Sequence, residues 1–374
     1  MNALFMIIIL IVLLAILFGG HFFIYFSLIK FFEITGNNAK LCLGVILAIL
    51  SVSFIASSIL AHYNENGLTR TLYFSSGIWL GVALNLVMAF AVVWALVWIY
   101  GSAGSAIYQK YLVALAIVIA FAYSGCGIWN AYHPKLKHIE IKIKNLPSAW
   151  RNKTAVQISD VHLGLVLGAD FLRGVVDQIN SAKPDVVFIT GDLFDGMDGK
   201  LDSLVKPLDD IKAPDGMYFV TGNHETYLGV DEALGALQKT RVKILDDKMT
   251  SIDGMQIIGI GYPQRMEKKN IVNVVDNLPG FDRNQPSILL YHNPDAVKQA
   301  EAAGVSLMLA GHTHKGQLFP ISFIDRLIYG RYYYGLNQDG NFSIYTSAGV
   351  GTWGPTMRTD ATPEIVVIKF ESLN

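Results

Sequence analysis

Charged residues are scarce in this chain. Asp, Glu, Lys and Arg together make up 16% of its 374 residues, whereas a soluble domain carries roughly 25%. The deficit is confined to residues 1–132, which are nearly free of these residue types, and hydrophobic residues reach 52% of the whole chain. This composition excludes a protein that is soluble over its whole length, and it indicates that the first third lies in lipid.

Net charge and cysteine are also low. A formal net charge of −1 offers no basic surface for nonspecific binding to nucleic acid, so we expect no nucleic-acid partner. The two cysteines, Cys42 and Cys126, lie inside apolar runs. We expect them to be small buried hydrophobic residues rather than metal ligands.

Long hydrophobic runs take the place of charge in the first third of the chain. Each run is near or above the roughly 20 residues that are needed to cross a bilayer. The runs cover 4–29, 41–61, 73–100 and 111–132, and polar connections at 33–40, 64–70 and 101–110 separate them. Tryptophan and tyrosine residues gather toward the ends of the runs, as interfacial anchors do. We therefore predict an all-α anchor of four transmembrane helices, residues 1–133, in the lipid bilayer.

Beyond Pro134 the sequence changes to short apolar runs that end in polar residues. Their strand, helix, strand order predicts parallel strands, whose carboxyl ends form the crevice where ligands gather. Five runs are followed by residues that can bind a metal ion: Asp160 and His162 after 154–159, Asp192 after 185–190, Asn223 after 216–221, His292 after 287–291, and His312 and His314 after 305–310. We expect these seven side chains to form one site.

The ligand types indicate which ions the site would hold. Imidazole, carboxylate and amide oxygen suit manganese, iron, zinc or magnesium better than soft copper, and no thiolate is nearby. Seven ligands exceed the needs of one catalytic tetrahedral centre, but they suit two ions about 3.5–4 Å apart that share a carboxylate. We therefore predict two divalent metal ions as cofactors.

These blocks resemble the calcineurin-like metallophosphoesterase family. The family pattern of D-x-H, G-D-x-x-D, G-N-H-[DE], a lone His and G-H-x-H is met in order from about Val156 to the C-terminus. The resemblance implies that residues 134–374 form an α/β sandwich of two mixed β-sheets flanked by helices. It also implies that one metal is bound by Asp160, His162, Asp192 and His314, and the other by Asp192, Asn223, His292 and His312, with Asp192 as the bridge.

The same resemblance implies a catalytic role for His224. This residue follows the position of the family's histidine that contacts the phosphate and can protonate the leaving oxygen. Its partner is expected to be a carboxylate such as Asp195, for which a catalytic role and a solvated loop position both stay open. Glu225 fills the last acidic position of the motif, and we interpret it as a solvated loop carboxylate.

Two further segments, GHTHKGQ at 311–317 and SAGVGTWGPTMRTDATPEI at 347–365, resemble a membrane-associated branch of the family. This branch is related to bacterial lipid-sugar (UDP-2,3-diacylglucosamine) pyrophosphatases and has Gly-Gly-Gln after the last histidine, whereas Lys315 replaces the first glycine here. Lys315 is either a cation near the substrate phosphate or a solvent-exposed side chain. Arg358 is a candidate phosphate clamp, because a guanidinium can bind phosphate through two parallel hydrogen bonds.

The site predicts an enzyme that hydrolyses phosphoric esters. Two metal ions lower the pKa of a bound water and stabilise the charge that develops on the reacting oxygens. Because the chain is anchored in a bilayer, we expect the substrate to be a lipid-linked phosphoester or pyrophosphate. Two alternatives remain: a phosphodiesterase or phosphatase for soluble nucleotides or phosphoproteins, and a membrane sensor whose phosphoesterase domain is a ligand-binding output.

The distribution of positive charge predicts the orientation of the anchor. With four spans, both ends of the anchor lie on one side of the membrane, and that side carries more Lys and Arg. These residues are Arg70, Lys135, Lys137, Lys142 and Lys144, against Lys30, Lys40 and Lys110 on the other side. We predict a multi-pass protein of the bacterial inner membrane with a cytoplasmic catalytic domain. The Tyr-rich segment 322–339 fits a lid, a membrane contact or plain packing.

Overall fold

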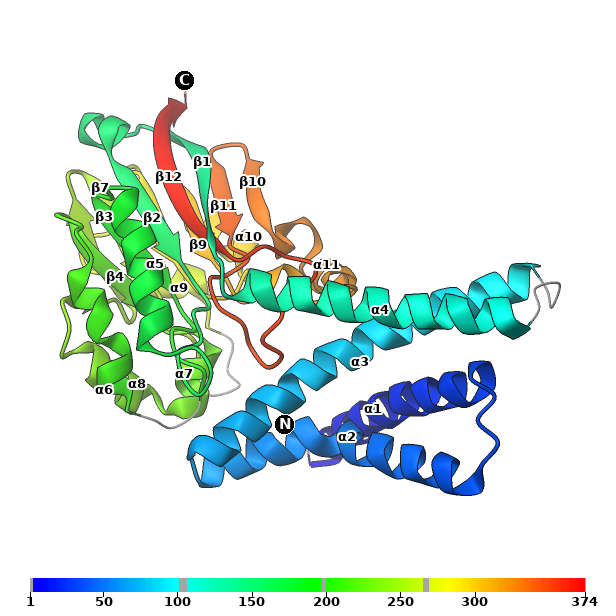
Figure 1. Cartoon of the computed structure of the whole chain (residues 1–374). Coiled ribbons are helices and arrows are strands. Elements are labelled where there is room, and N and C mark those ends of the chain that lie inside the picture. Colours follow the sequence, from blue (N-terminus) through cyan, green and yellow to red (C-terminus); the bar gives the residue numbers. More distant parts are fainter. Residues whose placement is uncertain (1–2, 101–105, 197–199, 265–268, 374) are drawn as a thin grey trace. The chain divides into compact units, whose positions relative to one another are not determined.

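The chain begins with four long apolar helices. The computed structural model describes residues 3–100, 106–196, 200–264 and 269–373, so the predicted connection 101–110 lies partly outside the described residues. The helices are α1 (Ala3–Phe31), α2 (Asn37–Tyr63), α3 (Gly67–Tyr100) and α4 (Ala106–Ala131) (Figure 1). Within the described residues, these four helices are long and apolar enough to cross a membrane. The prediction of an all-α part with four apolar helices is confirmed.

Polar side chains on the helices pair with one another. Trp79 Nε1 on α3 donates to His21 Nε2 on α1 over 2.9 Å, and Asn85 Nδ2 on α3 donates to Ser124 Oγ on α4 over 2.8 Å. In an apolar environment a polar group without a partner costs free energy, so such pairs fix which helix faces meet. Cys42 and Cys126 are exposed on the helix surfaces, and the expectation that they are buried is wrong.

Contacts divide the chain into two compact units, and one short segment groups with the helices although it lies far away in sequence. The first unit comprises Met1–Trp129 and Gly354–Thr359, and the second comprises Asn130–Trp353 and Asp360–Asn374. In the first unit, Arg358 N donates to Gly127 O over 2.8 Å and the Tyr123 hydroxyl donates to Thr359 O over 2.7 Å. The helical unit therefore includes residues from near the end of the chain.

The second unit contains two mixed six-stranded sheets among the described residues. The first has the order β1-β12-β2-β3-β4-β5 and the second the order β10-β11-β9-β8-β7-β6. The strands are β1 (Lys135–Lys144), β2 (Thr154–Ile158), β3 (Val186–Thr190), β4 (Gly216–Val220), β5 (Val242–Ile244), β6 (Lys248–Ile252), β7 (Met255–Gly259), β8 (Ser287–Leu290), β9 (Leu307–Ala310), β10 (Gly335–Asp339), β11 (Phe342–Thr346) and β12 (Glu364–Leu373). This arrangement confirms the predicted fold class.

Strands β2 to β5 pair in parallel, as do β7, β8, β9 and β11. Antiparallel pairing occurs where β12 meets β2, where β10 meets β11 and where β6 meets β7, while β1 pairs with β12 in parallel. Every residue of β2 and β3 is buried, so both faces of these strands are covered. Continuous apolar strands of this kind are typical of parallel sheets between other layers.

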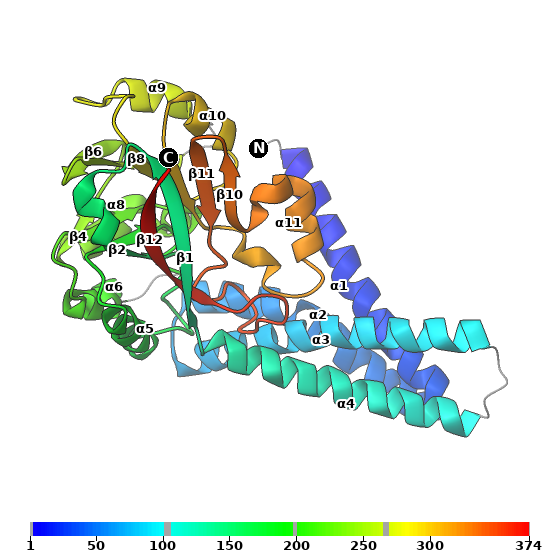
Figure 2. The ribbon, with the colours of Figure 1, turned by 90° about the horizontal axis from the view of Figure 1, so that it is seen from above.

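Helices cover the outer faces of the two sheets. The helices of this unit are α5 (Ala169–Ser181), α6 (Leu201–Val205), α7 (Asn223–Leu228), α8 (Val230–Leu237), α9 (Ile271–Asp276), α10 (Val297–Ala302) and α11 (Ser322–Tyr329), with 3-10 turns η2 (Ser148–Asn152), η3 (Lys206–Asp210), η4 (His314–Gly316) and η5 (Gly330–Tyr333). Figure 2 shows α5 and α6 on one side of the sheets and α9 and α10 on the other. One apolar core fills the space between the sheets and two more lie under the helices.

Trp150 tests the core between the sheets. Its side chain is fully buried, its Nε1 donates to Ile252 O over 2.8 Å, and its ring forms a T-shaped pair with that of Phe370, with centroids 5.1 Å apart. We expect Trp150→Ala to destabilise this unit by about 3–5 kcal/mol and to lower its melting temperature by roughly 10 °C. Calorimetry of the full chain in detergent measures this. Trp98→Ala, at an 85% exposed position on α3, is the control, and equal shifts for both variants would contradict the assignment.

Candidate metal centre

The predicted ligands converge because they follow neighbouring strands. Asp160 and His162 follow β2, and Asp192 follows β3, its neighbour in the first sheet. His292 follows β8, and the loop after the adjacent β9 carries the last two histidines. Among the described residues, three groups bring ligand atoms within 4.8 Å of one another: Asp160, His162 and His314; His162, Asp192 and His224; and Asp192, His292 and His312.

Short distances connect these groups into one centre. Nε2 of His162 lies 3.0 Å from Nε2 of His314, and the latter atom lies 3.4 Å from Asp160 Oδ1. Asp192 Oδ2 lies 3.0 Å from His292 Nε2, which is 4.0 Å from Asp160 Oδ1. Asp192 and His162 each belong to two of the three groups. A carboxylate has two oxygens to offer, so the position of Asp192 suits a ligand shared by two ions.

Asn223 joins the centre at the start of α7. Its Oδ1 lies 2.9 Å from Nδ1 of His312. The structure thus brings all seven predicted ligand residues together, and their roles as ligands remain a prediction.

Glycines in the motifs permit this close approach. A Cβ atom on Gly222 would lie 2.2 Å from Asp192 Oδ1, and one on Gly311 would lie 2.2 Å from Asp160 Oδ2. Neither distance is possible for a real side chain, so each ligand carboxylate requires a glycine beside it. Steric exclusion therefore explains why the sequence motifs have glycine directly before Asn223 and His312.

The main chain at the ligands is left-handed. Five of the ligand residues have positive φ: Asp160 (53°), His162 (52°), Asp192 (50°), His312 (76°) and His314 (50°). A residue other than glycine in this region costs of order 1–3 kcal/mol, and such residues gather at functional sites. Lys315 also has a φ of 51°, a conformation that favours glycine.

Main-chain carbonyls orient two of the imidazoles. The ring N–H at Nδ1 of His292 donates to Thr190 O over 2.7 Å, and that at Nδ1 of His224 donates to Asp195 O over 2.8 Å. A metal-ligating histidine usually donates its second ring N–H in this way, which fixes the tautomer and turns the other nitrogen toward the ion. The Nε2 atom of His292 is therefore turned toward Asp192.

The donor set fits divalent metal ions. Nε2 of His292 is buried and makes no well-aligned hydrogen bond among the described residues, although Asp192 Oδ2 lies 3.0 Å away. Nε2 of His162 and Nε2 of His314 also face each other at 3.0 Å, so at least one of these nitrogens must direct a lone pair between the two rings. Nitrogen and oxygen donors in this arrangement suit hard or borderline ions.

The electrostatics of the buried ligands support the same conclusion. Burial and the nearby Asp192 raise the pKa of Asp160 to about 6, although His292 opposes this shift. Burial would also raise the pKa of Asp192, but His292 holds it below its usual range. Burial would lower the pKa of His292, but Asp192 and Asp160 raise it to about 10. The two carboxylates therefore stabilise positive charge between them, and a bound cation would supply it.

Glu225 connects the loops that carry the ligands. Its carboxylate accepts main-chain hydrogen bonds from Asp192 (3.0 Å), Leu193 (2.9 Å), Phe194 (3.1 Å) and Gly222 (2.6 Å). The side chain is fully buried, so the expectation of a solvated loop carboxylate is wrong. Burial and the nearby Asp192 raise its pKa to about 7. The last acidic position of the G-N-H-[DE] motif therefore holds the loop after β3 against the loop after β4.

The remaining predicted residues have different surroundings. Asp195 contacts His224 through its main-chain carbonyl, whereas its carboxylate is buried and lies 3.9 Å from Nδ1 of His162. Nζ of Lys315 lies 4.5 Å from the centre of the Tyr334 ring. Arg358 is fully buried and belongs to the segment that groups with the helices. Phosphate binding by Lys315 and Arg358 stays a prediction.

Aromatic side chains surround the centre, and sequence reasoning did not single them out for this place. Tyr227 and Trp353 are 67% and 57% exposed, and their ring centres lie 5.1 Å and 5.8 Å from that of His224. The side-chain amide of Gln317 fixes the main chain of Trp353. Gln317 Nε2 donates to Trp353 O and Trp353 N donates to Gln317 Oε1, each over 3.0 Å. Gln317, the last residue of the GHTHKGQ motif, was the sequence feature that could have indicated the position of Trp353. These rings can contact an apolar or planar part of a substrate.

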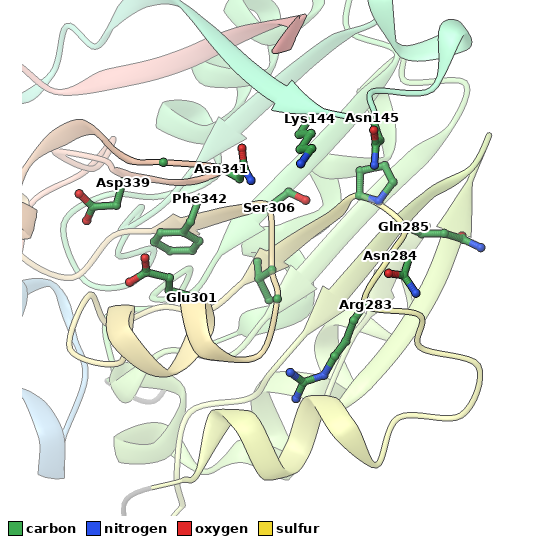
Figure 3. Close-up of a pocket in the computed structure, with 14 residues that line it drawn as sticks. Lys144, Asn145, Arg283, Asn284, Gln285, Glu301, Ser306, Asp339, Asn341 and Phe342 are labelled. Carbon is green, nitrogen blue, oxygen red and sulfur yellow. The ribbon is translucent and has the colours of Figure 1, made fainter. Parts of the chain in front are cut away.

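A separate cavity of about 550 Å³ lies near the amino-terminal ends of β9 and β11 in the second sheet, whereas the metal centre lies at the carboxyl ends of its strands (Figure 3). Ser306, just before β9, and Phe342, the first residue of β11, line it, and none of the predicted metal ligands does within the described part of the chain. Two of its charged residues are already engaged, Arg283 with Asp276 and Asp339 with Arg331. The cavity therefore offers no comparable set of convergent ligands.

Glu225→Gln tests the connection between the loops. An amide can accept hydrogen bonds only through its oxygen, so two of the four main-chain N–H groups would face an NH₂ group. We expect a loss of about 1–3 kcal/mol in the free energy of unfolding and a lower metal content. Calorimetry and elemental analysis of the purified chain measure both. Glu232→Gln, at an exposed position on α8, should change neither, and a normal metal content in Glu225→Gln would contradict the assignment.

Comparison with known proteins agrees with this geometry. A family model described as calcineurin-like phosphoesterase matches residues 153–316. An uncharacterised metallophosphoesterase of Campylobacter jejuni is 31% identical over 269 residues, which cover 71% of this chain and 70% of that protein. One of Helicobacter pylori is 32% identical over 250 residues, 65% of this chain and 66% of that protein.

A third relative is named as a transmembrane protein. A transmembrane protein with metallophosphoesterase domain from Danio rerio is 33% identical over 274 residues, which cover 68% of this chain and 61% of that protein. The matched part thus spans between 61% and 70% of the length of these three relatives. The similarity in sequence and the grouped histidine and aspartate side chains agree, and the chain belongs to the calcineurin-like metallophosphoesterase family.

Proposed function

We propose that this metal-dependent phosphoesterase hydrolyses a phosphoester or pyrophosphate bond in a lipid-linked substrate, with two divalent metal ions and an activated water. The observation that supports the two-ion proposal most directly is the position of Asp192. Its carboxylate belongs both to the group with His162 and His224 and to the group with His292 and His312. When bound, two such ions lower the pKa of a water and stabilise charge on the attacking and leaving oxygens.

We propose that His224 donates a proton to the leaving oxygen. Its Nδ1–H is held by Asp195 O, so Nε2 is the nitrogen that can exchange a proton with substrate. The main-chain N–H of His224 also donates to Asp192 Oδ1 over 2.8 Å, and this bond fixes the position of the histidine relative to the shared carboxylate. Burial lowers the pKa of His224, although Asp192 opposes this shift. A lowered pKa makes the protonated ring a stronger acid, which favours proton transfer to an alkoxide.

Four apolar helices support a lipid-linked substrate. An enzyme fixed to a bilayer meets substrates at the lipid surface, and the exposed rings of Tyr227 and Trp353 beside His224 can contact an apolar chain. The most specific form of the proposal is a nucleotide-linked lipid such as UDP-diacylglucosamine, and it rests on the sequence resemblance alone. We further propose a bacterial inner-membrane location with the catalytic unit in the cytoplasm, from the distribution of Lys and Arg.

Hydrolysis by the purified full chain in detergent tests the proposal. We expect manganese-dependent cleavage of bis(p-nitrophenyl) phosphate and faster cleavage of a lipid-linked pyrophosphate. Asp192→Asn should abolish both activities and lower the metal content, since it removes the shared carboxylate. Asp170→Asn, at a side chain that is 92% exposed on α5, should change neither.

The role of His224 is tested by the leaving group. General acid catalysis contributes about 10²–10⁴-fold, and nitrophenolate leaves readily without a proton. His224→Ala should therefore lower kcat at least about 100-fold on an alkyl phosphate ester and less than about tenfold on the nitrophenyl ester.

Equal losses on the alkyl and nitrophenyl esters would contradict the proton transfer. Cleavage of soluble nucleotides with no cleavage of lipid-linked substrates would reject the lipid-linked substrate. A chain that holds two ions and cleaves none of these compounds would favour the ligand-binding output instead.

A further inference from the structure

Helix α11 presents its apolar side outward. None of its eight residues, all of which the structure describes, is buried. Four apolar side chains are strongly exposed: Phe323 (59%), Ile324 (55%), Leu327 (86%) and Ile328 (66%). At 100° per residue these four lie within one arc of about 140°. Phe319 and Ile321, just before the helix, are 39% and 38% exposed and extend the same apolar surface.

Asp325 and Tyr329, on the other side of α11, face the protein instead. Asp325 accepts a main-chain hydrogen bond from Gly316, and burial raises its pKa to about 6. The ring of Tyr329 lies edge-on to that of His312, with centroids 6.1 Å apart. In a soluble protein the apolar stripe of a surface helix faces the core. The orientation of α11 is the reverse, and these contacts prevent the helix from rotating to hide its apolar side.

Contacts on the C-terminal side also fix α11 in place. Thr313 Oγ1 donates to Tyr333 O over 2.7 Å, and Thr346 Oγ1 donates to Tyr332 O over 2.8 Å. Both tyrosines belong to η5, which follows α11 directly, and α11 lies beside β10 at the margin of the second sheet (Figure 2). The apolar surface is therefore a fixed feature of the metal-binding unit.

We propose that the apolar side of α11 inserts into the surface of the bilayer that holds the four helices. A helix with a strong apolar face and flanking tyrosine and arginine residues is typical of segments that lie in the membrane interface. Arg326 is exposed on α11 and Tyr332 and Tyr333 follow it. The helical part of the same chain keeps the unit close to lipid, so no other partner has to be recruited.

The size of the surface favours lipid over protein. It consists of six apolar residues on one short helix and the turn before it, whereas a stable protein interface uses about 20–30 residues on each side. An exposed apolar patch of this kind marks an interaction site rather than ordinary surface. A bilayer can cover a small convex patch, because acyl chains adapt to its shape.

Insertion of α11 would also place the metal centre at the lipid surface, because Tyr329 on α11 touches His312. A phosphate at the head-group level would then reach the ligands while the acyl chains stay in the bilayer. This second consequence rests on the proposed lipid-linked substrate. The membrane contact itself does not depend on which ester is cleaved.

Fluorescence of the full chain in liposomes tests the contact. In a Cys42→Ser, Cys126→Ser background, Leu327→Cys is labelled with an environment-sensitive dye, and Asp170→Cys on α5 is the matched control. We expect brominated acyl chains to quench the dye at position 327 at least twofold and to leave the control unchanged. Iodide in the water should quench only the control.

Two outcomes would overturn the proposal. Quenching at position 327 by iodide and not by brominated lipid would place α11 in water. Protection from both quenchers would mean that protein covers α11, either the helices of this chain or a second copy. Neither measurement requires activity, so failure of the proposed substrate does not affect the result.

Kinetics provide the second test. Leu327→Gln combined with Ile328→Gln replaces the two most exposed of the four apolar side chains of the helix. We expect KM for a lipid-linked substrate in liposomes to rise at least tenfold, with kcat/KM on bis(p-nitrophenyl) phosphate unchanged. Equal losses on both substrates would indicate damage to the centre, and no loss on either would show that α11 does not contribute to binding at the membrane.

Discussion

Asp160 and Asp192 are both buried beside a group of imidazoles, and a buried carboxylate costs free energy unless donors or positive charge lie close to it. The fold supplies some donors itself. The main-chain N–H of His312 donates to Asp160 and that of His224 donates to Asp192. These bonds require the loops after β9 and β4 to approach the loops after β2 and β3 closely. The glycines, the left-handed ligand residues and the position of Glu225 all follow from this requirement.

Local sequence patterns predicted the elements better than their assembly. The apolar lengths predicted four helices, and the runs at 154–159 and 185–190 predicted β2 and β3, because these patterns depend on neighbouring residues alone. The presence of two sheets came from the family resemblance. No local pattern indicated that β1 pairs with β12, whose residues lie more than 200 positions further along the chain. Pairing over such a distance depends on the packing of everything between.

The candidate site shows the same division. Residue types at strand ends predicted which side chains converge, since parallel strands deliver their carboxyl ends to one edge of a sheet. The sequence did not indicate that Asp195 would meet His224 through a carbonyl, because any residue type supplies that oxygen. Nor did it place Tyr227 and Trp353 beside His224, since a surface aromatic has no motif of its own. Glu225 was misjudged because its four donors are main-chain groups.

The segment 354–359 has a consequence for biosynthesis. The helical unit includes Arg358 and Thr359, which the ribosome adds about 230 residues after Trp129. At typical translation speeds this interval is roughly 10–45 s. During that time the four helices lack segment 354–359, which forms hydrogen bonds with Gly127 and Tyr123. Strands β1 to β11 of the two sheets are synthesised in the same interval. The helical unit is thus the first to begin, and its packing is complete only after most of the second unit has been synthesised.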